Sequence, residues 1–113
     1  MPDCIFCDIG KGQTKTKILF HDDSCFVIRD INPSAPTHLL VIPNQHVTSI
    51  ANLNPAEEQA VGHLFTIAHK MALREDATSG GFRLVINQGR DAGQHVDHIH
   101  LHLLAGKRLP ALG

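Results

Sequence analysis

The chain contains a segment, residues 98–104, that alternates histidine with apolar residues: His-Ile-His-Leu-His-Leu-Leu. Because successive side chains of a β-strand point to opposite faces, this alternation predicts a strand over residues 97–105 with three histidines on one face. The apolar residues on the other face suit a protein core. Buried imidazoles need hydrogen-bond partners or ligands, so we interpret the segment as one wall of a functional site.

The hydrophobic pattern elsewhere predicts a single α+β domain over residues 1–113. The clearest element is a helix over residues 54–75, with Asn54 as its cap, Pro55 in the first turn and apolar residues at helical spacing. A short helix is predicted over residues 4–9. Further strands are predicted over residues 17–21, 24–30, 37–43 and 81–87. The short connections favour a five-stranded antiparallel sheet with the long helix packed on it.

Composition narrows the possible partners. Hydrophobic residues make up 42% of the chain and charged residues 19%, which is typical of a globular protein. The net charge of −1 argues against a broad surface for a nucleic acid polymer or an anionic membrane, while leaving room for a local phosphate pocket.

The N-terminus and the cysteines indicate the compartment. Met1-Pro2-Asp3-Cys4 has neither a basic segment nor an apolar one behind it, and no apolar run reaches membrane-span length, so we expect a cytoplasmic protein. The three cysteines are an odd number, which speaks against a disulfide framework. Cys25 lies in an apolar run and is expected to be buried.

A glycine-containing loop, residues 88–97, leads directly into the histidine segment. Gly89 and Gly93 permit unusual backbone angles and a close approach of the backbone to a ligand. Backbone N–H groups that converge in such a loop can bind an anion. Together with the neighbouring imidazoles, the loop indicates a site for a phosphoryl group.

Three hypotheses account for the histidines. In the first, a neutral imidazole attacks phosphorus and forms a covalent phospho-histidine bond. In the second, two histidines of the row and a distant third, His38 or His46, bind a catalytic zinc ion. In the third, Cys4 and Cys7 join two histidines from elsewhere in a structural zinc site. The first and third hypotheses are compatible with each other.

These segments together resemble the histidine-triad (HIT) family, and within it the Hint-like branch. Residues 98–104 match the family motif H-φ-H-φ-H-φ-φ, in which φ is an apolar residue. Further matches lie at residues 4–9, 29–33, 35–43, 87–89 and 92–94. The resemblance covers nearly the whole chain. It implies a HIT-like fold, a homodimer formed through the long helix and a neighbouring strand, and a nucleoside phosphoramidase or related nucleotide hydrolase.

The resemblance also implies catalytic roles. His100 would be the nucleophile on the α-phosphate of a nucleoside 5′-phosphoramidate, forming a nucleotidyl-histidine that water then hydrolyses. His102 would bind a phosphate oxygen. His98 and His38 would support the nucleophile through hydrogen bonds. No metal is needed for this chemistry.

The substrate implied is a purine nucleotide such as AMP or GMP. The base pocket would consist of Phe6, Ile9, Ile31 and Leu40, with Asp30 on the ribose hydroxyls. The phosphate side would be formed by Asn87, Gly93, Gln94, His95 and Val96. Asn87 distinguishes the phosphoramidase branch from dinucleoside polyphosphate hydrolases, which tend to carry Gln there.

The metal site implied by the resemblance is a structural zinc site, formed by Cys4, Cys7, His46 and His98.

The chain departs from the family at His95, where Ser or Thr is usual and can protonate the leaving amine. An imidazolium could serve as that acid. Asp97 also replaces a residue that is often apolar. The alternatives are a dinucleoside polyphosphate hydrolase, or a nucleotide- or zinc-binding interaction module with little catalysis.

Overall fold

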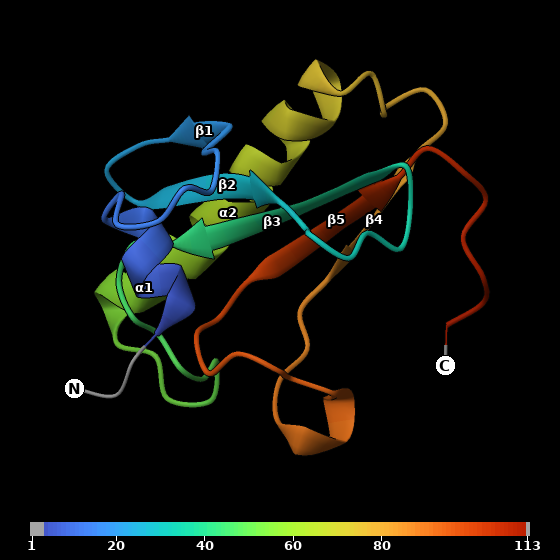
Figure 1. The fold of residues 1–113 in the computed structure, drawn as a ribbon. Helices are drawn as coiled ribbons and strands as arrows, with labels where there is room; N and C mark the ends of the chain where they lie inside the picture. Colours follow the sequence, from blue (N-terminus) through green and yellow to red (C-terminus); the bar gives the residue numbers. More distant parts are fainter. Residues whose placement is uncertain (1–3, 113) are drawn as a thin grey trace.

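The computed structural model describes residues 4–112, so the expectation for Met1, Pro2 and Asp3 lies outside it. The elements in chain order are α1 (Ile5–Gly10), β1 (Phe20–His21), β2 (Cys25–Arg29), β3 (Thr37–Pro43), α2 (Pro55–Arg74), β4 (Phe82–Val85), the 3₁₀-helix η1 (Arg90–Ala92) and β5 (Leu101–Ala105). All the strand pairs are antiparallel and the sheet order is β1-β2-β3-β5-β4 (Figure 1). The predicted five-stranded α+β fold is therefore confirmed.

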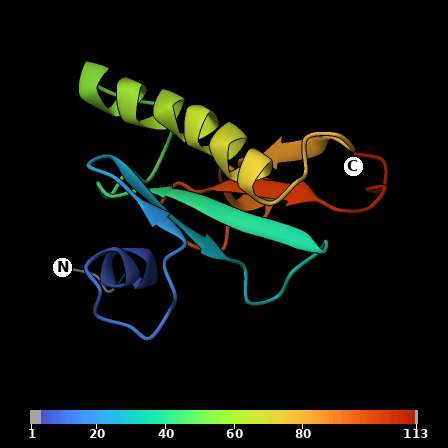
Figure 2. The same ribbon diagram turned by 90° about the horizontal axis from the view of Figure 1, so that it is seen from above.

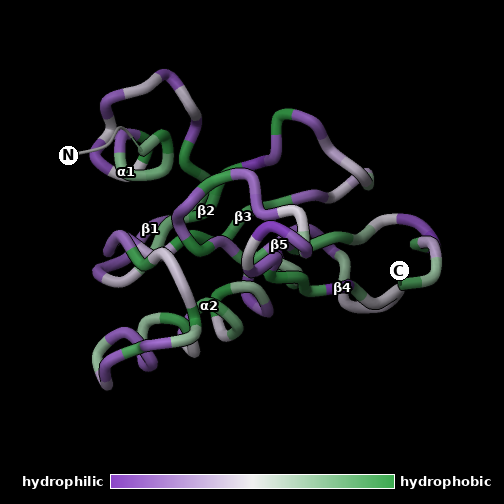
Figure 3. Tube along the Cα trace, turned by 90° about the horizontal axis from the view of Figure 1, so that it is seen from below, coloured by the Kyte–Doolittle hydropathy of each residue, from purple (hydrophilic) through white to green (hydrophobic). Residues whose placement is uncertain are grey.

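The two helices lie on opposite faces of the sheet (Figure 2). Strand alternation divides the core between them: Val27, Val41 and Leu103 belong to the α2 side, whereas Phe26 and Leu40 belong to the α1 side. Both faces of β2 and β3 are thus buried, and these strands are the most continuously hydrophobic part of the trace in Figure 3. By the same parity, the even-numbered histidines of β3 and β5 face α1.

The long helix begins where its capping residues predict. The Asn54 side chain accepts a hydrogen bond from the Glu57 N–H at 2.8 Å, and the Glu57 carboxylate accepts one from the Asn54 N–H at 2.9 Å. This reciprocal capping box satisfies two N–H groups at the helix start. The buried face, which includes Leu64 and Met71, packs on the sheet. The helix thereby fixes the sheet whose other face carries the histidines.

The histidine segment joins the sheet later than the sequence pattern predicts. The strand β5 begins at Leu101, not at residue 97, because the Ile99 N–H donates instead to the Val47 carbonyl at 2.7 Å, outside the sheet. The alternation of side chains nevertheless continues, since Ile99 is buried in the same core as Leu101. The strands β1 and β4 are also shorter than predicted, because each lies at an edge and pairs with only part of its neighbour.

Two histidines of α2 lie outside the triad. His63 Nε2 is 2.8 Å from Asp22 Oδ2 and ties the helix to the β1–β2 turn, whereas His69 is exposed. Cys25 is fully buried as predicted, and burial raises the pKa of its thiol to about 12. Neither helix of the described chain is long and apolar enough to cross a membrane.

Candidate active site

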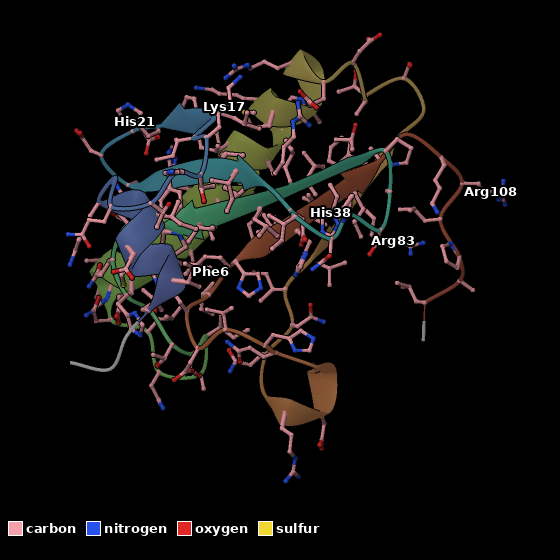
Figure 4. The ribbon with its side chains drawn as sticks, in the orientation of Figure 1. Phe6, Lys17, His21, His38, Arg83 and Arg108 are labelled. Atoms are coloured by element: carbon pink, nitrogen blue, oxygen red, sulfur yellow. The ribbon has the colours of Figure 1, made fainter. Side chains whose placement is uncertain are left out.

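A cavity of about 690 Å³ opens on the α1 side of the sheet. Its volume is within the range of small-molecule sites. It is lined by Ile5, Phe6, Ile9, Thr16, Ile28, Arg29, Asp30, Ile31, Asn32, Ser34, His38, Leu40, Asn87, Gly93, His95, Val96, His100 and His102. The cavity therefore gathers most of the predicted site residues from α1, the segment after β2, β3, the segment before β5 and β5 itself. Figure 4 labels two of them, Phe6 on α1 and His38 near the start of β3.

The ring of His100 has a defined orientation. Its Nδ1 lies 2.8 Å from the carbonyl oxygen of His98. A carbonyl oxygen can only accept a hydrogen bond, so Nδ1 carries the proton and the lone pair of the neutral ring is on Nε2. The ring packs against Phe6, with centroids 5.0 Å apart. This arrangement leaves Nε2 as the unprotonated nitrogen available to a ligand.

A second hydrogen-bond chain orients His102. The Ser34 N–H donates to His38 Nδ1 at 3.0 Å, and His38 Nε2 lies 2.9 Å from His102 Nδ1. Because the Ser34 N–H can only donate, Nδ1 of a neutral His38 is the acceptor and Nε2 carries the proton, so the Nε2–H of His38 donates a hydrogen bond to His102 Nδ1. The remaining nitrogen of a neutral His102, Nε2, is then a hydrogen-bond donor. His100 and His102 in their neutral forms thus have opposite tautomers.

Burial keeps this histidine chain neutral. The pKa of His102 falls to about 4, mainly because burial disfavours the charged ring and also because His100 and His38 lie beside it. Burial likewise lowers the pKa of His38, against the opposing effect of Asp30, whose Oδ2 is 3.4 Å from His38 Nε2. Near neutral pH the Asp30–His38 contact is therefore not an ion pair.

The structure gives specific contacts to His38 and His98, the two residues expected to support the nucleophile His100. His38 is expected to support the nucleophile through a hydrogen bond; its ring instead hydrogen-bonds to His102, whose ring in turn lies against that of His100, with centroids 5.0 Å apart. His98 does contact His100, through its backbone carbonyl and not through its ring. The His98 ring is fully buried outside the cavity and faces the cysteines of the N-terminal segment.

The glycine loop has its own internal support. Gly89 and Gly93 have φ angles of 84° and 79°, a region that residues with a Cβ rarely adopt. Gln94 accepts a hydrogen bond from the Gly89 N–H and donates one to the Val96 carbonyl. Gln94 consequently braces the loop and does not line the cavity, unlike the other residues predicted for the phosphate side. Asn87 lines it and donates to the Ala92 carbonyl at 2.9 Å.

The opposite side of the cavity is apolar. Phe6, Ile9 and Leu40 are buried in one cluster, as expected for a wall that a planar base could contact, whereas Ile31 is 88% exposed at the rim. The sequence reasoning missed the lining residues Ile5, Thr16, Ile28, Arg29, Asn32 and Ser34. Ser34 acts through its backbone N–H, for which the sequence carries no signal.

The four residues predicted as metal ligands converge beside the cavity. Cys4 Sγ lies 3.4 Å from His98 Nδ1, Cys7 Sγ lies 3.6 Å from the same nitrogen, and Cys7 Sγ lies 3.1 Å from His46 Nδ1. All four ligand atoms are within 4.8 Å of one another. The two cysteines come from α1 and its N-cap, His46 from the segment after β3, and His98 from the segment before β5.

This Cys/His cluster fits a structural zinc ion. With the usual Zn–S and Zn–N lengths, tetrahedral geometry places sulfur and nitrogen ligands about 3.5 Å apart, close to the separations observed. His98 Nε2 also lies 2.9 Å from the Pro43 carbonyl. That hydrogen bond puts the proton on Nε2 and directs the lone pair of Nδ1 at the sulfurs, which is the usual outer-shell support of a ligating histidine.

The comparison with known proteins identifies the family. The chain matches the HIT domain over residues 11–109 and belongs to the HIT family. Purine nucleoside phosphoramidase of Escherichia coli (strain K12) is 40% identical to it over 107 residues, covering 95% of this chain and 90% of the relative.

Two solved structures resemble the whole fold. A histidine triad protein from Clostridium difficile has a TM-score of 0.93 and 38% identity, covering 100% of this chain and 98% of the other. A zinc-bound histidine triad family protein from Mycobacterium smegmatis has a TM-score of 0.81 and 29% identity, covering 93% of this chain and 76% of the other. The recognised family and fold are thereby confirmed.

The hydrogen bonds of His100 and His102 predict the tautomer of each ring. We expect ¹⁵N NMR near neutral pH to find the proton of His100 on Nδ1 and that of His102 on Nε2. In the variant His38→Phe, His102 loses the donor to its Nδ1 and should become a mixture of tautomers, while His100 is unchanged. A His102 ring protonated on Nδ1 in the unaltered protein would contradict the proposed chain.

Proposed function

We propose that the protein is a nucleotide hydrolase that acts on the α-phosphate of nucleoside 5′-phosphoramidates through a nucleotidyl-histidine intermediate. The observation that carries the proposal is the pair of hydrogen-bond contacts, His100 Nδ1 to the His98 carbonyl and His38 Nε2 to His102 Nδ1, which assign opposite tautomers to His100 and His102. His100 offers a lone pair at Nε2, and His102 offers an N–H. A nucleophile and a hydrogen-bond donor side by side suit attack on a phosphoryl group.

The reaction proceeds in two displacements. Nε2 of His100 attacks the α-phosphorus, the P–N bond to the amine breaks, and the amine leaves with a proton. Water then attacks the same phosphorus, breaking the P–Nε2 bond and releasing the mononucleotide. His102 donates from Nε2 to a phosphoryl oxygen, where negative charge develops. His95, an exposed imidazole on the cavity wall, protonates the leaving amine in the first displacement and accepts the proton that water loses in the second.

The substrate is a purine nucleotide such as AMP or GMP joined to an amine. The base lies against Phe6, Ile9, Ile31 and Leu40, and Asp30 accepts hydrogen bonds from the ribose hydroxyls. The phosphate side is formed by Asn87, Gly93, His95 and Val96. The named activity of the Escherichia coli relative and Asn87 in place of Gln favour a phosphoramidate over a dinucleoside polyphosphate.

The proposed structural zinc is held by Cys4, Cys7, His46 and His98. When bound, it supplies a cross-link between α1 and the histidine segment, and takes no part in the displacements. Thiolate ligands require reduced cysteines, which favours a cytoplasmic location. The site would fix the His98 backbone, whose carbonyl orients the nucleophile.

We also propose a homodimer formed through α2 and the edge strand β4. Phe65 and Leu73 on α2, eight residues apart, are 46% and 56% exposed and lie on one side of the helix. The strand β4 lies at the end of the sheet, where one edge has no strand beside it among residues 4–112. A second copy placed there would cover both features.

The proposed nucleophile predicts the effect of one substitution. His100→Ala should lower turnover of adenosine 5′-phosphoramidate by on the order of 10⁴-fold or more, because the covalent step needs Nε2. The variant should still fold and bind AMP, as measured by circular dichroism and calorimetry. His21→Ala, at an exposed histidine of β1, should turn over normally. Full activity in His100→Ala would refute covalent catalysis here, and binding without turnover in the unaltered protein would support an interaction module.

The metal proposal predicts a defined loss on substitution. Elemental analysis should find one zinc ion per chain in the unaltered protein and in Cys25→Ser, whose cysteine is remote from the cluster. Cys7→Ser should lose most of the zinc, because Cys7 contacts both His46 and His98. Chelation should lower the midpoint of thermal unfolding, since metal binding stabilises the folded state. Zinc-free protein from zinc-supplemented cells would argue against the site.

The dimer proposal predicts a change in mass. Phe65→Glu places a charge in the proposed interface, so light scattering after size exclusion should give the monomer mass, against the dimer mass for the unaltered protein. Lys15→Glu, in the exposed loop between α1 and β1, should remain dimeric. A monomeric unaltered protein at all concentrations measured would show that these surfaces are not an interface.

A further inference from the structure

The cysteines of the Cys/His cluster are placed to react with each other. Cys4 is the N-cap of α1 and Cys7 lies three residues on, and the two sulfurs are within 4.8 Å of one another. The Cys7 N–H donates to Cys4 Sγ at 3.4 Å, so both sulfurs lie on the same side of the first turn. Residues three apart on a helix have Cβ atoms about 5–6 Å apart, whereas a disulfide needs about 3.5–4.5 Å, so the first turn of α1 must tighten as the bond forms.

The cysteines also differ in their access to reagents. Cys4 and Cys7 are partly exposed, and Cys4 lines a separate surface hollow together with Asp8 and His46. Cys25, in contrast, is fully buried in the core on the other face of the sheet. A small oxidant in solution can therefore reach the first two sulfurs and not the third.

The same short helix forms part of the nucleotide cavity. Phe6 lies between the two cysteines in sequence and packs against the rings of both His98 and His100, with centroids 5.8 Å and 5.0 Å apart. Ile9 lines the cavity one turn later. The position of this wall depends on the contacts that hold α1 to the sheet, and the Cys/His cluster supplies several of them.

We propose that Cys4 and Cys7 are a redox modification site, converted by a peroxide into an intramolecular disulfide that weakens nucleotide binding. Two thiols lose two electrons and two protons, an S–S bond forms, and the O–O bond of hydrogen peroxide breaks to give two molecules of water. The disulfide sulfurs carry no charge and no longer serve as ligands. The ring nitrogens of His46 and His98 then lose their partners, and α1 loses this attachment beside Phe6.

The disulfide is expected to be reversible. The loop it closes is very short, so it gains little stability from restricting the unfolded chain, and partly exposed disulfides are readily reduced by thiols. A bound metal competes with oxidation, because both use the same sulfur lone pairs. The site would thus respond both to peroxide and to metal supply.

The experiment treats reduced, metal-free protein with equimolar hydrogen peroxide and then counts free thiols after denaturation. The unaltered chain should fall from three thiols to one, with a mass decrease of two hydrogens and no intermolecular product. Cys25→Ala should show the same loss of two thiols, whereas Cys7→Ser should form no intramolecular disulfide. Protein loaded beforehand with Zn²⁺ should oxidise at least about tenfold more slowly, since its thiolates are held as ligands.

Calorimetry with AMP measures the consequence of the modification. The affinity should fall about tenfold on oxidation, as expected when part of an apolar wall is displaced, and dithiothreitol should restore it. Retention of all three thiols, equal oxidation rates with and without Zn²⁺, or an unchanged AMP affinity in the oxidised protein would overturn the proposal. The expected loss of AMP affinity rests on the proposed nucleotide site. Neither the thiol count nor the AMP affinity depends on turnover, so a failure of the catalytic proposal would be distinguished by the turnover assay.

Discussion

The arrangement of this site depends on the three interactions of a single residue, His98. Its Nε2 lies 2.9 Å from the Pro43 carbonyl at the end of β3, and its Nδ1 lies among the sulfurs of the N-terminal segment. Its carbonyl oxygen accepts from His100 Nδ1. One buried residue therefore joins a central strand, α1 and the proposed nucleophile. Any movement of its ring or backbone would alter the orientation of His100.

The alternating pattern of the sequence was sufficient to predict the face and the core, but not the contacts between histidines. The period-two spacing predicted that Ile99, Leu101 and Leu103 would be buried together, and they are. It could not show that the segment joins the sheet only at Leu101, because that depends on the hydrogen bond from the Ile99 N–H to the Val47 carbonyl. Spacing defines a face, whereas the register of distant strands decides which rings meet on it.

The contacts that orient the site histidines illustrate the same limit. His38 meets His102 because β3 and β5 are paired with Leu40 opposite His102, a register that neither segment specifies alone. Ser34 orients His38 through a backbone N–H, a group that every residue except proline has. The Cys/His cluster was easier to anticipate, since cysteine and histidine are uncommon residues with specific chemistry. Resemblance to a family supplied the grouping, and the distances supply the physical reason for it.

The burial of the histidines divides the proposed chemistry between two kinds of imidazole. The pKa of His102 is lowered to about 4, so near neutral pH this ring acts through an N–H dipole and not through a positive charge. A neutral, oriented donor does not repel the neighbouring imidazole as that ring takes on positive charge by attacking phosphorus. Proton exchange with water is better suited to an exposed group, and His95 on the cavity wall is such a group. In the proposed mechanism, the nucleophile His100 is buried and the donor His102 is half-buried, whereas the proton source His95 is exposed. His100 and His102 can therefore keep fixed tautomers while protons are exchanged with water at His95.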